Sequence, residues 1–285
     1  MKQFRPLLIG LILLALSANT SVAQVEPSMR AERQDFLQYE PAIFELGLKN
    51  ISDSDIIFAK DDNGKPWVNF IIKHINLNRR VMKEKELEIP NVIIPKFGSR
   101  TLPINITPYY TIRETGQYTI QAAVKLKTGG ALVTSPLVFN IGRGSKMWEE
   151  NKIVQGSKLE FSLLRFGTKS NVNLYMRVES PADNLVYATN ILGPIVAFAP
   201  PVVEFDPDLT WHVLHAVGAK TYRYSMIDSH GKILLQEDRR VSGTLPRFTR
   251  NQNGLITIVG GTKPQDTSEA ELLSAGQSGL SELTQ

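Results

Sequence analysis

The stretch ETGQYTIQAAVKLK, residues 114–127, is the part of the sequence that decides the fold. From Tyr118 onward apolar and polar side chains alternate, through Ile120 and Val124 to Leu126. A period of two residues places the two sets of side chains on opposite faces of an extended strand. One face is then buried and the other is wet, which is typical of an antiparallel sheet.

The same alternation recurs on both sides of this stretch. It covers residues 43–49 and 101–107 on the N-terminal side, and no part of residues 25–142 has sustained helical periodicity. Polar turns separate the runs, among them Asp61 to Gly64, which carries the Asn-Gly hairpin signal. After residue 157 short apolar runs follow one another at intervals of about 10–12 residues. The sequence therefore predicts an all-β fold.

The residues Glu114 to Tyr118 resemble the acidic-x-Gly-x-Tyr signature of the tyrosine corner in immunoglobulin-like domains. Antibody domains have Cys two positions after the Tyr, where this chain has Ile120. The resemblance is therefore to a bacterial secreted immunoglobulin-like β-sandwich without the disulfide bridge, and Trp67 is a candidate for its core Trp. It covers residues 25–142, implies a sandwich for this half of the chain, and implies no particular ligand.

The second half predicts another antiparallel β unit, either a sandwich or propeller-like hairpins. Residues 211–236 loosely resemble the hairpins of a β-propeller blade. From Gly260 the composition changes to Ser, Gly, Gln, Thr and acids, which favours disorder. The expected organisation is a signal peptide at 1–23, an immunoglobulin-like β-sandwich at 24–142, a linker at 143–156, an antiparallel β domain at 157–260 and a disordered tail at 261–285.

The first 23 residues have the pattern of a secretory signal peptide. Lys2 and Arg5 precede the apolar run at residues 7–16, and Ser21 to Ala23 supplies the small residues of a cleavage site. A run of this length is too short for a transmembrane helix, which takes about 20 residues. We expect cleavage after Ala23 and a protein that is secreted or periplasmic, without an integral membrane span.

Composition and spacing exclude several kinds of chemistry. The chain has no Cys and a net charge of +4, without a basic stripe, so we expect no nucleic-acid partner. His212 and His215 are an odd number of residues apart, so on a strand they would point to opposite faces and could not share a metal ion. Asp206 and Asp208, like the acids near Asp61, are explained as turn residues that bond the local backbone.

We therefore identify no catalytic, cofactor-binding or metal-binding residue and expect no cofactor. The expected function is that of an exported, non-catalytic binding or interaction protein of the cell envelope or extracellular space, with a protein or carbohydrate ligand. The alternative is a carbohydrate- or peptide-processing enzyme, or its accessory module. Polar side chains grouped at a loop end of the second unit would favour the enzyme. A flat strand edge or an exposed apolar patch would favour the interaction protein.

Overall fold

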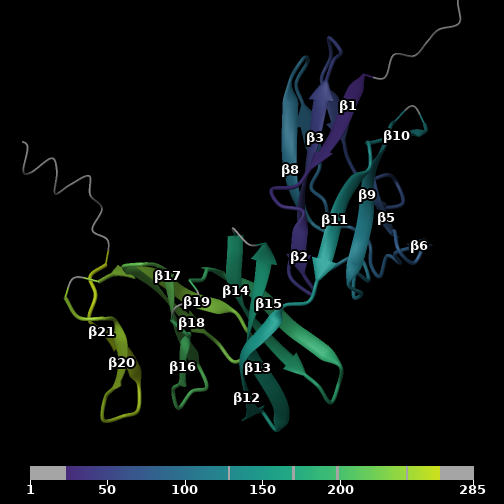
Figure 1. The fold of residues 1–285 in the computed structure, drawn as a ribbon. Coiled ribbons are helices and arrows are strands. Elements are labelled where there is room, and N and C mark those ends of the chain that lie inside the picture. The colour runs from purple at the N-terminus through teal and green to yellow at the C-terminus, as the bar shows by residue number, and fades with distance from the viewer. Residues whose placement is uncertain (1–23, 128, 169–170, 197–198, 242, 264–285) are drawn as a thin grey trace, which may run out of the picture.

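The computed structural model describes residues 24–127, 129–168, 171–196, 199–241 and 243–263. Within these ranges the chain forms 21 β-strands and no helix, which confirms the predicted all-β class (Figure 1). The predicted signal peptide and all but three residues of the predicted disordered tail lie outside the described residues, so both remain predictions.

Eleven strands occupy the N-terminal half of the described chain. They are β1 (Val25–Arg30), β2 (Asp35–Leu37), β3 (Ile43–Asn50), β4 (Ile56–Phe58), β5 (Val68–His74), β6 (Arg79–Arg80), β7 (Val92–Ile94), β8 (Ser99–Asn105), β9 (Gly116–Lys125), β10 (Ala131–Val133) and β11 (Leu137–Gly142). One sheet has the order β1-β3-β8 and another the order β2-β11-β9-β5-β6, with β10 also paired to β9. Strands β4 and β7 form a small sheet of their own.

The alternation in the opening stretch sets the packing of this half. In β9 the side chains of Tyr118, Ile120 and Val124 are buried, while their neighbours in sequence are more exposed. The Tyr118 ring stacks on Phe139 of β11 with ring centroids 5.3 Å apart. Strand β3 contributes Phe44 and its alternate apolar neighbours to the same core. Burial of these faces supplies the main driving force for folding of the segment.

The C-terminal half consists of consecutive antiparallel strands. They are β12 (Ser145–Val154), β13 (Ser157–Thr168), β14 (Asn171–Ser180), β15 (Leu185–Pro194), β16 (Val202–Phe205), β17 (Trp211–Gly218), β18 (Thr221–Ile227), β19 (Ile233–Arg240), β20 (Arg247–Arg250) and β21 (Ile256–Val259). Strands β12 to β15 form one four-stranded sheet in chain order, β16 to β19 form the next, and β20 and β21 form a hairpin.

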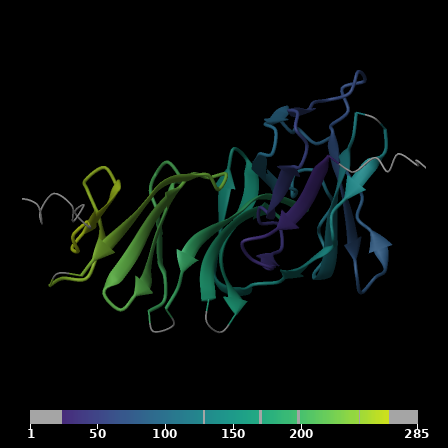
Figure 2. The same cartoon turned by 90° about the horizontal axis from the view of Figure 1, so that it is seen from above.

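The two four-stranded sheets pack on each other through aromatic side chains. Trp211 of β17 is fully buried, and its ring lies 5.4 Å from that of Phe161 and 6.1 Å from that of Phe205. Trp148 of β12 stacks on the same group, with its ring centroid 6.2 Å from that of Trp211. Figure 2 shows the sheets in a row, from the purple strands of the N-terminal half to the yellow hairpin β20–β21.

These findings correct the family resemblance. The chain is a series of small sheets in a propeller-like arrangement, and the immunoglobulin-like sandwich predicted for residues 24–142 is not supported. The local corner is present, because the Tyr118 hydroxyl donates a hydrogen bond to the Glu114 carbonyl at 2.7 Å. Such a corner requires only a tight turn that leads into a strand. The motif therefore predicted the turn and the strand, but it does not determine how the sheets assemble.

The segment predicted as a linker, residues 143–156, also differs from the expectation. Ten of its residues form β12, the edge strand of the first four-stranded sheet. Its charged side chains, at Lys146, Glu149, Glu150 and Lys152, face solvent to varying degrees and hide the strand pattern in the sequence. Trp148 nevertheless anchors the strand, because it packs against the aromatic group between the two sheets.

A short segment after β1 contacts the C-terminal half. Leu37 is fully buried against Leu164 and Tyr175. Arg33 donates hydrogen bonds to the Tyr175 hydroxyl at 2.7 Å and to the Glu40 carboxylate at 2.6 Å. We call residues 33–40 the clasp, because they join the N-terminal core to the outer face of the sheet β12–β15.

Candidate functional site

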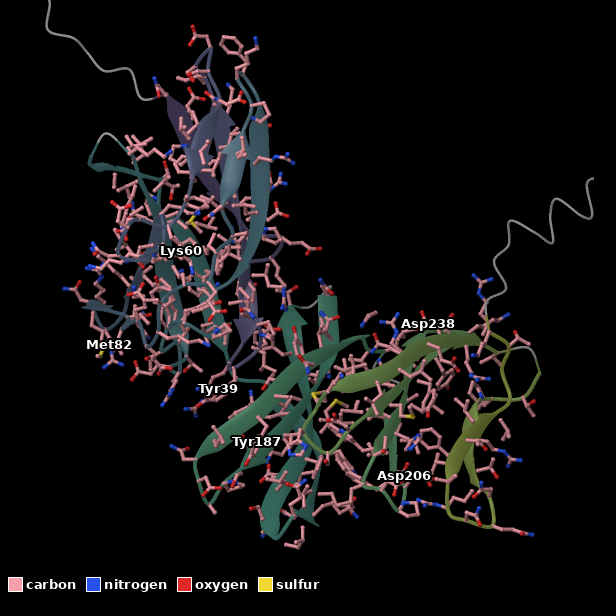
Figure 3. The ribbon with its side chains drawn as sticks, turned by 180° about the vertical axis from the view of Figure 1, so that it is seen from behind. Tyr39, Lys60, Met82, Tyr187, Asp206 and Asp238 are labelled. Carbon is pink, nitrogen blue, oxygen red and sulfur yellow. The ribbon has the colours of Figure 1, made fainter. Side chains whose placement is uncertain are left out.

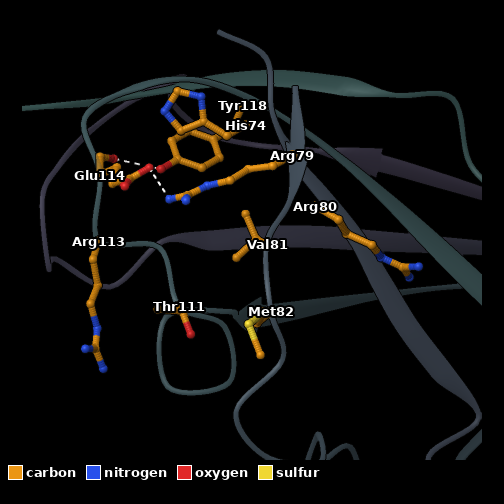
Figure 4. A pocket seen from close by; sticks show the side chains of 9 residues that line it. All are labelled: His74, Arg79, Arg80, Val81, Met82, Thr111, Arg113, Glu114 and Tyr118. Carbon is orange, nitrogen blue, oxygen red and sulfur yellow. Dashed lines mark hydrogen bonds and ion pairs between the residues drawn. The ribbon is translucent and has the colours of Figure 1, made fainter. Parts of the chain in front are cut away.

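A cavity of about 310 Å³ lies where β5 turns into β6, facing the loop that leads into β9 (Figure 4). The strands bring to it residues that are far apart in sequence. The lining residues are His74, Arg79, Arg80, Val81, Met82, Thr111, Arg113, Glu114 and Tyr118. We call this site the arginine cavity, because three of its nine lining residues are arginines.

The floor of the arginine cavity is rigid. His74 and Tyr118 are both buried, and their rings lie 4.5 Å apart between centroids. The His74 Nδ1 accepts a hydrogen bond from the Leu77 amide at 3.3 Å, and Nε2 lies 3.2 Å from the Thr115 carbonyl. A carbonyl can only accept a hydrogen bond, so the ring proton is on Nε2 and the imidazole is fixed in orientation.

Gly116 and Tyr118 shape the loop beside this floor. Gly116 has φ +144°, and a Cβ at this position would lie 2.6 Å from the His74 ring, so only glycine fits without displacement. Burial raises the pKa of Tyr118 to about 12. The phenol therefore stays neutral at physiological pH and keeps donating its hydrogen bond to Glu114.

The walls of the cavity are positively charged. Arg79 pairs with Glu114, and Arg113 pairs with Glu84 at 3.0 Å, but Arg80 has no carboxylate partner among the described residues. These two ion pairs are about half exposed or more, and exposed pairs contribute little to stability. An incoming anion could therefore take the place of either carboxylate at small cost.

A second depression, of about 470 Å³, adjoins the arginine cavity. It shares His74, Arg113 and Glu114 with the cavity and adds Arg143, which also has no carboxylate partner in the described part of the chain. The linings of the two depressions contain four arginines, at residues 79, 80, 113 and 143, and the carboxylate of Glu114, while Glu84 lies next to them as the partner of Arg113. Guanidinium groups bind carboxylates, sulfates and phosphates through paired hydrogen bonds.

The hydroxyl and imidazole groups of the arginine cavity are already engaged in hydrogen bonds. In the arginine cavity the Thr111 and Tyr118 hydroxyl groups donate hydrogen bonds to the Glu84 carboxylate and to the Glu114 carbonyl. The His74 imidazole is held by two backbone groups. The Glu84 carboxylate that accepts from Thr111 is also paired with Arg113, and the Tyr118 hydroxyl is bonded to a backbone carbonyl, which is not a base.

A second polar cluster lies in the C-terminal half. The His212 Nδ1 lies 2.7 Å from the Tyr224 hydroxyl, and Nε2 lies 3.4 Å from the Asp206 carboxylate. The side chains of His212 and Asp206 are 3% and 10% exposed, and burial lowers the pKa of His212. Phe248 of the hairpin β20–β21 packs edge-on against the His212 and Tyr224 rings. The cluster is therefore covered in this structure.

The residues considered for metal binding lie as follows. His212 faces Phe248, whereas His215 lies on the other face of β17 with Trp211 and Val213. The Asp206 carboxylate accepts hydrogen bonds from the Asp208 and Thr210 amides, which is the predicted turn role. Asp61 does the same for residues 63 and 65. In the described part of the chain no group of three or more His, Cys, Asp or Glu residues is placed to hold a metal.

Sequence reasoning missed the arginine cavity. In the sequence Arg79 and Arg80 form a basic pair, which is typical of solvated residues at a strand end or turn. Their counterpart Arg113 is more than thirty residues away in sequence, and the pairing of β5 with β6 and β9 brings the three together. No local pattern marks such a site.

Comparison with known proteins adds no family. No family model matches the chain, and no curated protein matches it. A crystal structure of a β-glucosidase from Listeria innocua in complex with isofagomine aligns with 42% of this chain and 16% of that chain, at 14% identity and a TM-score of 0.28. A likeness at this level carries no conclusion about fold or function.

Proposed function

We propose that this chain is an exported, non-catalytic binding protein of the cell envelope or extracellular space, and that the arginine cavity binds an anionic group of a protein or carbohydrate ligand. The observation that carries the proposal is the excess of four guanidinium groups over two carboxylates around a rigid floor. Export rests on the signal-peptide pattern of residues 1–23. None of the described segments forms a helix that could cross a membrane.

The rigid floor supports binding because it reduces the entropy lost when a ligand is ordered. His74 is held by two backbone contacts and Tyr118 by one, so these two side chains are already ordered before a ligand binds. The exposed side chain of Met82, which lines the same cavity, offers apolar contact beside the charges. A ligand with a carboxylate next to an apolar group fits this combination.

The enzyme remains the second candidate, because polar side chains do gather in the C-terminal half. A Tyr–His–Asp group such as Tyr224, His212 and Asp206 could move a proton if a substrate reached it. Phe248 covers it, and both Tyr224 and His212 are buried. The exposed arginine cavity therefore supports binding more strongly than the covered cluster supports catalysis.

The test is a binding measurement with two acidic probes, a short polyglutamate peptide and an oligogalacturonate. Neutral polyglutamine and a neutral oligosaccharide serve as the probe controls. We expect at least one acidic probe to bind at low salt, more weakly at high salt, and about ten-fold more weakly to Arg80→Ala, since loss of one charged hydrogen bond is worth about 1.5 kcal/mol. Arg80 suits the test because its removal leaves no carboxylate unpaired.

Arg100→Ala is the matched protein control, because Arg100 is an exposed arginine on β8 outside the cavity. It should bind the acidic probe like the unmodified chain. Absence of binding by both acidic probes, or equal losses in Arg80→Ala and Arg100→Ala, would refute the assignment of the cavity as the binding site.

A further inference from the structure

Another cavity of the N-terminal half, of about 600 Å³, lies at the opposite end of β5 from the arginine cavity. Its rim is formed by the turn between β4 and β5 and by the turn that follows β9. Strand β5 has seven residues, so the two cavities are about 20 Å apart along it. Figure 3 labels Lys60 at this cavity and Met82 at the arginine cavity. We call it the lysine cavity, because lysines line it at positions 60, 65, 125 and 127.

Backbone hydrogen bonds bring these lysines together. The Asp61 amide donates to the Lys65 carbonyl at 3.0 Å, which closes the first turn and leaves Lys60 and Lys65 on its two sides. The Lys125 amide donates to the Trp67 carbonyl at 2.8 Å, so the end of β9 lies beside this turn. The Lys125 ammonium group also lies 3.7 Å from the Asp61 carboxylate. The lysines of the two turns therefore line one cavity, although they are distant in sequence.

The lysine cavity has an excess of two positive charges. Its four ammonium groups face two carboxylates, those of Asp61 and Asp62. The Asp61 carboxylate accepts hydrogen bonds from two amides of its own turn, chiefly that of Lys65, and these bonds lower its pKa. Among the described residues Lys60, Lys65 and Lys127 have no carboxylate within ion-pair distance. An anion that enters the cavity therefore meets ammonium groups that are not already neutralised.

Apolar side chains form the floor and one wall of the cavity. The Phe58 and Trp67 rings lie 4.9 Å apart between centroids, and the two residues are only 4% and 3% exposed. The Trp67 indole N–H donates to the Pro90 carbonyl at 3.1 Å, which satisfies its one donor. Ile57, which also lines the cavity, is 45% exposed, and its cross-strand partner Ile93 is 56% exposed. An exposed apolar surface thus adjoins the lysines.

We propose that the lysine cavity binds a phosphate monoester that carries an apolar group. A phosphate monoester has about two negative charges at neutral pH, which matches the excess of lysines over aspartates. Ammonium groups bind phosphate as point charges, so several can surround it without the paired geometry of guanidinium groups. The apolar group of the ligand contacts Ile57 and Ile93 and is thereby removed from water.

The site is separate from the function proposed for the arginine cavity, because the two cavities share no lining residue. Its ligand is one soluble molecule rather than a membrane surface. The apolar floor lies beneath the charged rim, so the end of a single molecule reaches it and the face of a bilayer does not.

The test is a ligand-observed NMR titration of the purified full chain at low salt with hexyl phosphate. Inorganic phosphate and hexanol are the probe controls, since each keeps one half of the proposed ligand. We expect hexyl phosphate to bind most tightly and hexanol to show no saturable binding. Lys60→Ala combined with Lys65→Ala should weaken the binding of hexyl phosphate about ten-fold, because two charged contacts are lost at a solvent-exposed site. Neither substitution leaves a carboxylate unpaired.

Lys96→Ala is the matched control, because Lys96 is an exposed lysine of the same half that lies outside the lysine cavity. It should bind hexyl phosphate like the unmodified chain. Ile57→Ser should remove the advantage of hexyl phosphate over inorganic phosphate while the affinity for inorganic phosphate stays the same. Lys127→Ala is the substitute if the double variant does not fold, and circular dichroism identifies the folded variants.

Four outcomes would overturn the proposal. The first is the absence of saturable binding of hexyl phosphate, including the case in which the chain binds vesicles with phosphatidic acid but not hexyl phosphate. The second is an equal loss in Lys96→Ala and in the lysine variant. The third is a loss in Arg80→Ala as large as that in the lysine variant, which would place the ester in the arginine cavity. The fourth is equal affinity for hexyl phosphate and inorganic phosphate.

Discussion

His215 should make the protein less stable as the pH falls. Its side chain is fully buried on β17, and neither ring nitrogen has a hydrogen-bond partner among the described residues. Burial, with a smaller contribution from the Arg223 guanidinium, lowers the pKa of His215 from 6.5 to about 4. In the unfolded chain the same imidazole is solvated and takes up a proton near pH 6.5.

The magnitude follows from this difference in proton uptake. Between about pH 6.5 and pH 4 the unfolded chain binds a proton at His215 that the folded chain does not bind. The free energy of unfolding therefore falls as the pH is lowered through this window, and the full contribution of His215 is present above it. Each pKa unit corresponds to about 1.4 kcal/mol, so the loss at pH 4 is about 3 kcal/mol. A domain with a stability of about 5–15 kcal/mol loses a substantial part of it.

The assay is urea unfolding at neutral pH and at about pH 4 of the unmodified chain, His215→Leu and His230→Leu. Leucine fills a similar volume and binds no proton, so His215→Leu should lose about 3 kcal/mol less between the two pH values. His230 lies on the surface in the turn before β19, and its replacement controls for the loss of any imidazole. The reasoning is refuted if His215→Leu and the unmodified chain lose the same free energy.

Three further predictions concern the start of β9 and the predicted signal peptide. Tyr118→Phe removes the hydrogen bond of the corner and should lower the free energy of unfolding by about 0.5–1.5 kcal/mol, whereas Tyr187→Phe at an exposed site should not change it. Gly116→Ala should cost at least about 2 kcal/mol in thermal or urea unfolding, because the added methyl group collides with His74 at a φ that disfavours alanine. Mass spectrometry of exported protein should show Gln24 as the N-terminus, and a soluble product that keeps Met1 would contradict export.

The strands could be predicted from the sequence because their signal is local. Alternation over residues 43–49 and 118–127 matches β3 and β9, and the buried positions are the apolar ones. The turn role of Asp61 and Asp206 was also predictable, since each side chain bonds amides two and four residues on. Such effects depend on a few neighbouring residues and need no knowledge of the fold.

The assembly of the sheets could not be predicted in the same way. The tyrosine corner at Tyr118 suggested a family, but its hydrogen bond to Glu114 spans four residues and does not depend on the neighbouring sheets. The charged side chains of β12 favour a linker in the sequence, and the partners of its Trp148 lie more than fifty residues later. Packing between sheets is set by contacts of this range, and periodicity does not encode them.

The arginine cavity and the burial of the histidines could not be predicted either, because both depend on contacts between residues that are distant in sequence. Arg80 and Arg113 line one cavity because of strand pairing, and each alone looks like an ordinary surface residue. The odd spacing of His212 and His215 indicated opposite faces, but not that both faces of β17 would be covered. A strand that is buried on both sides leaves no wet face, so its polar residues become either hydrogen-bonded, like His212, or unpartnered, like His215.

The clasp shows why the contact between the two halves of the chain could not be predicted from the sequence. The Glu40 side chain is almost fully buried, and it accepts hydrogen bonds from Arg33 and from the Leu37 amide. Arg33 in turn donates to the Tyr175 hydroxyl of the C-terminal half. The Arg33 side chain is 37% exposed whereas that of Glu40 is 1% exposed, so loss of Arg33 would leave a buried carboxylate without compensation. The two halves are thus joined both by the Arg33–Tyr175 hydrogen bond and by burial of Leu37 against Leu164 and Tyr175, contacts between distant segments that local patterns in the sequence do not reveal.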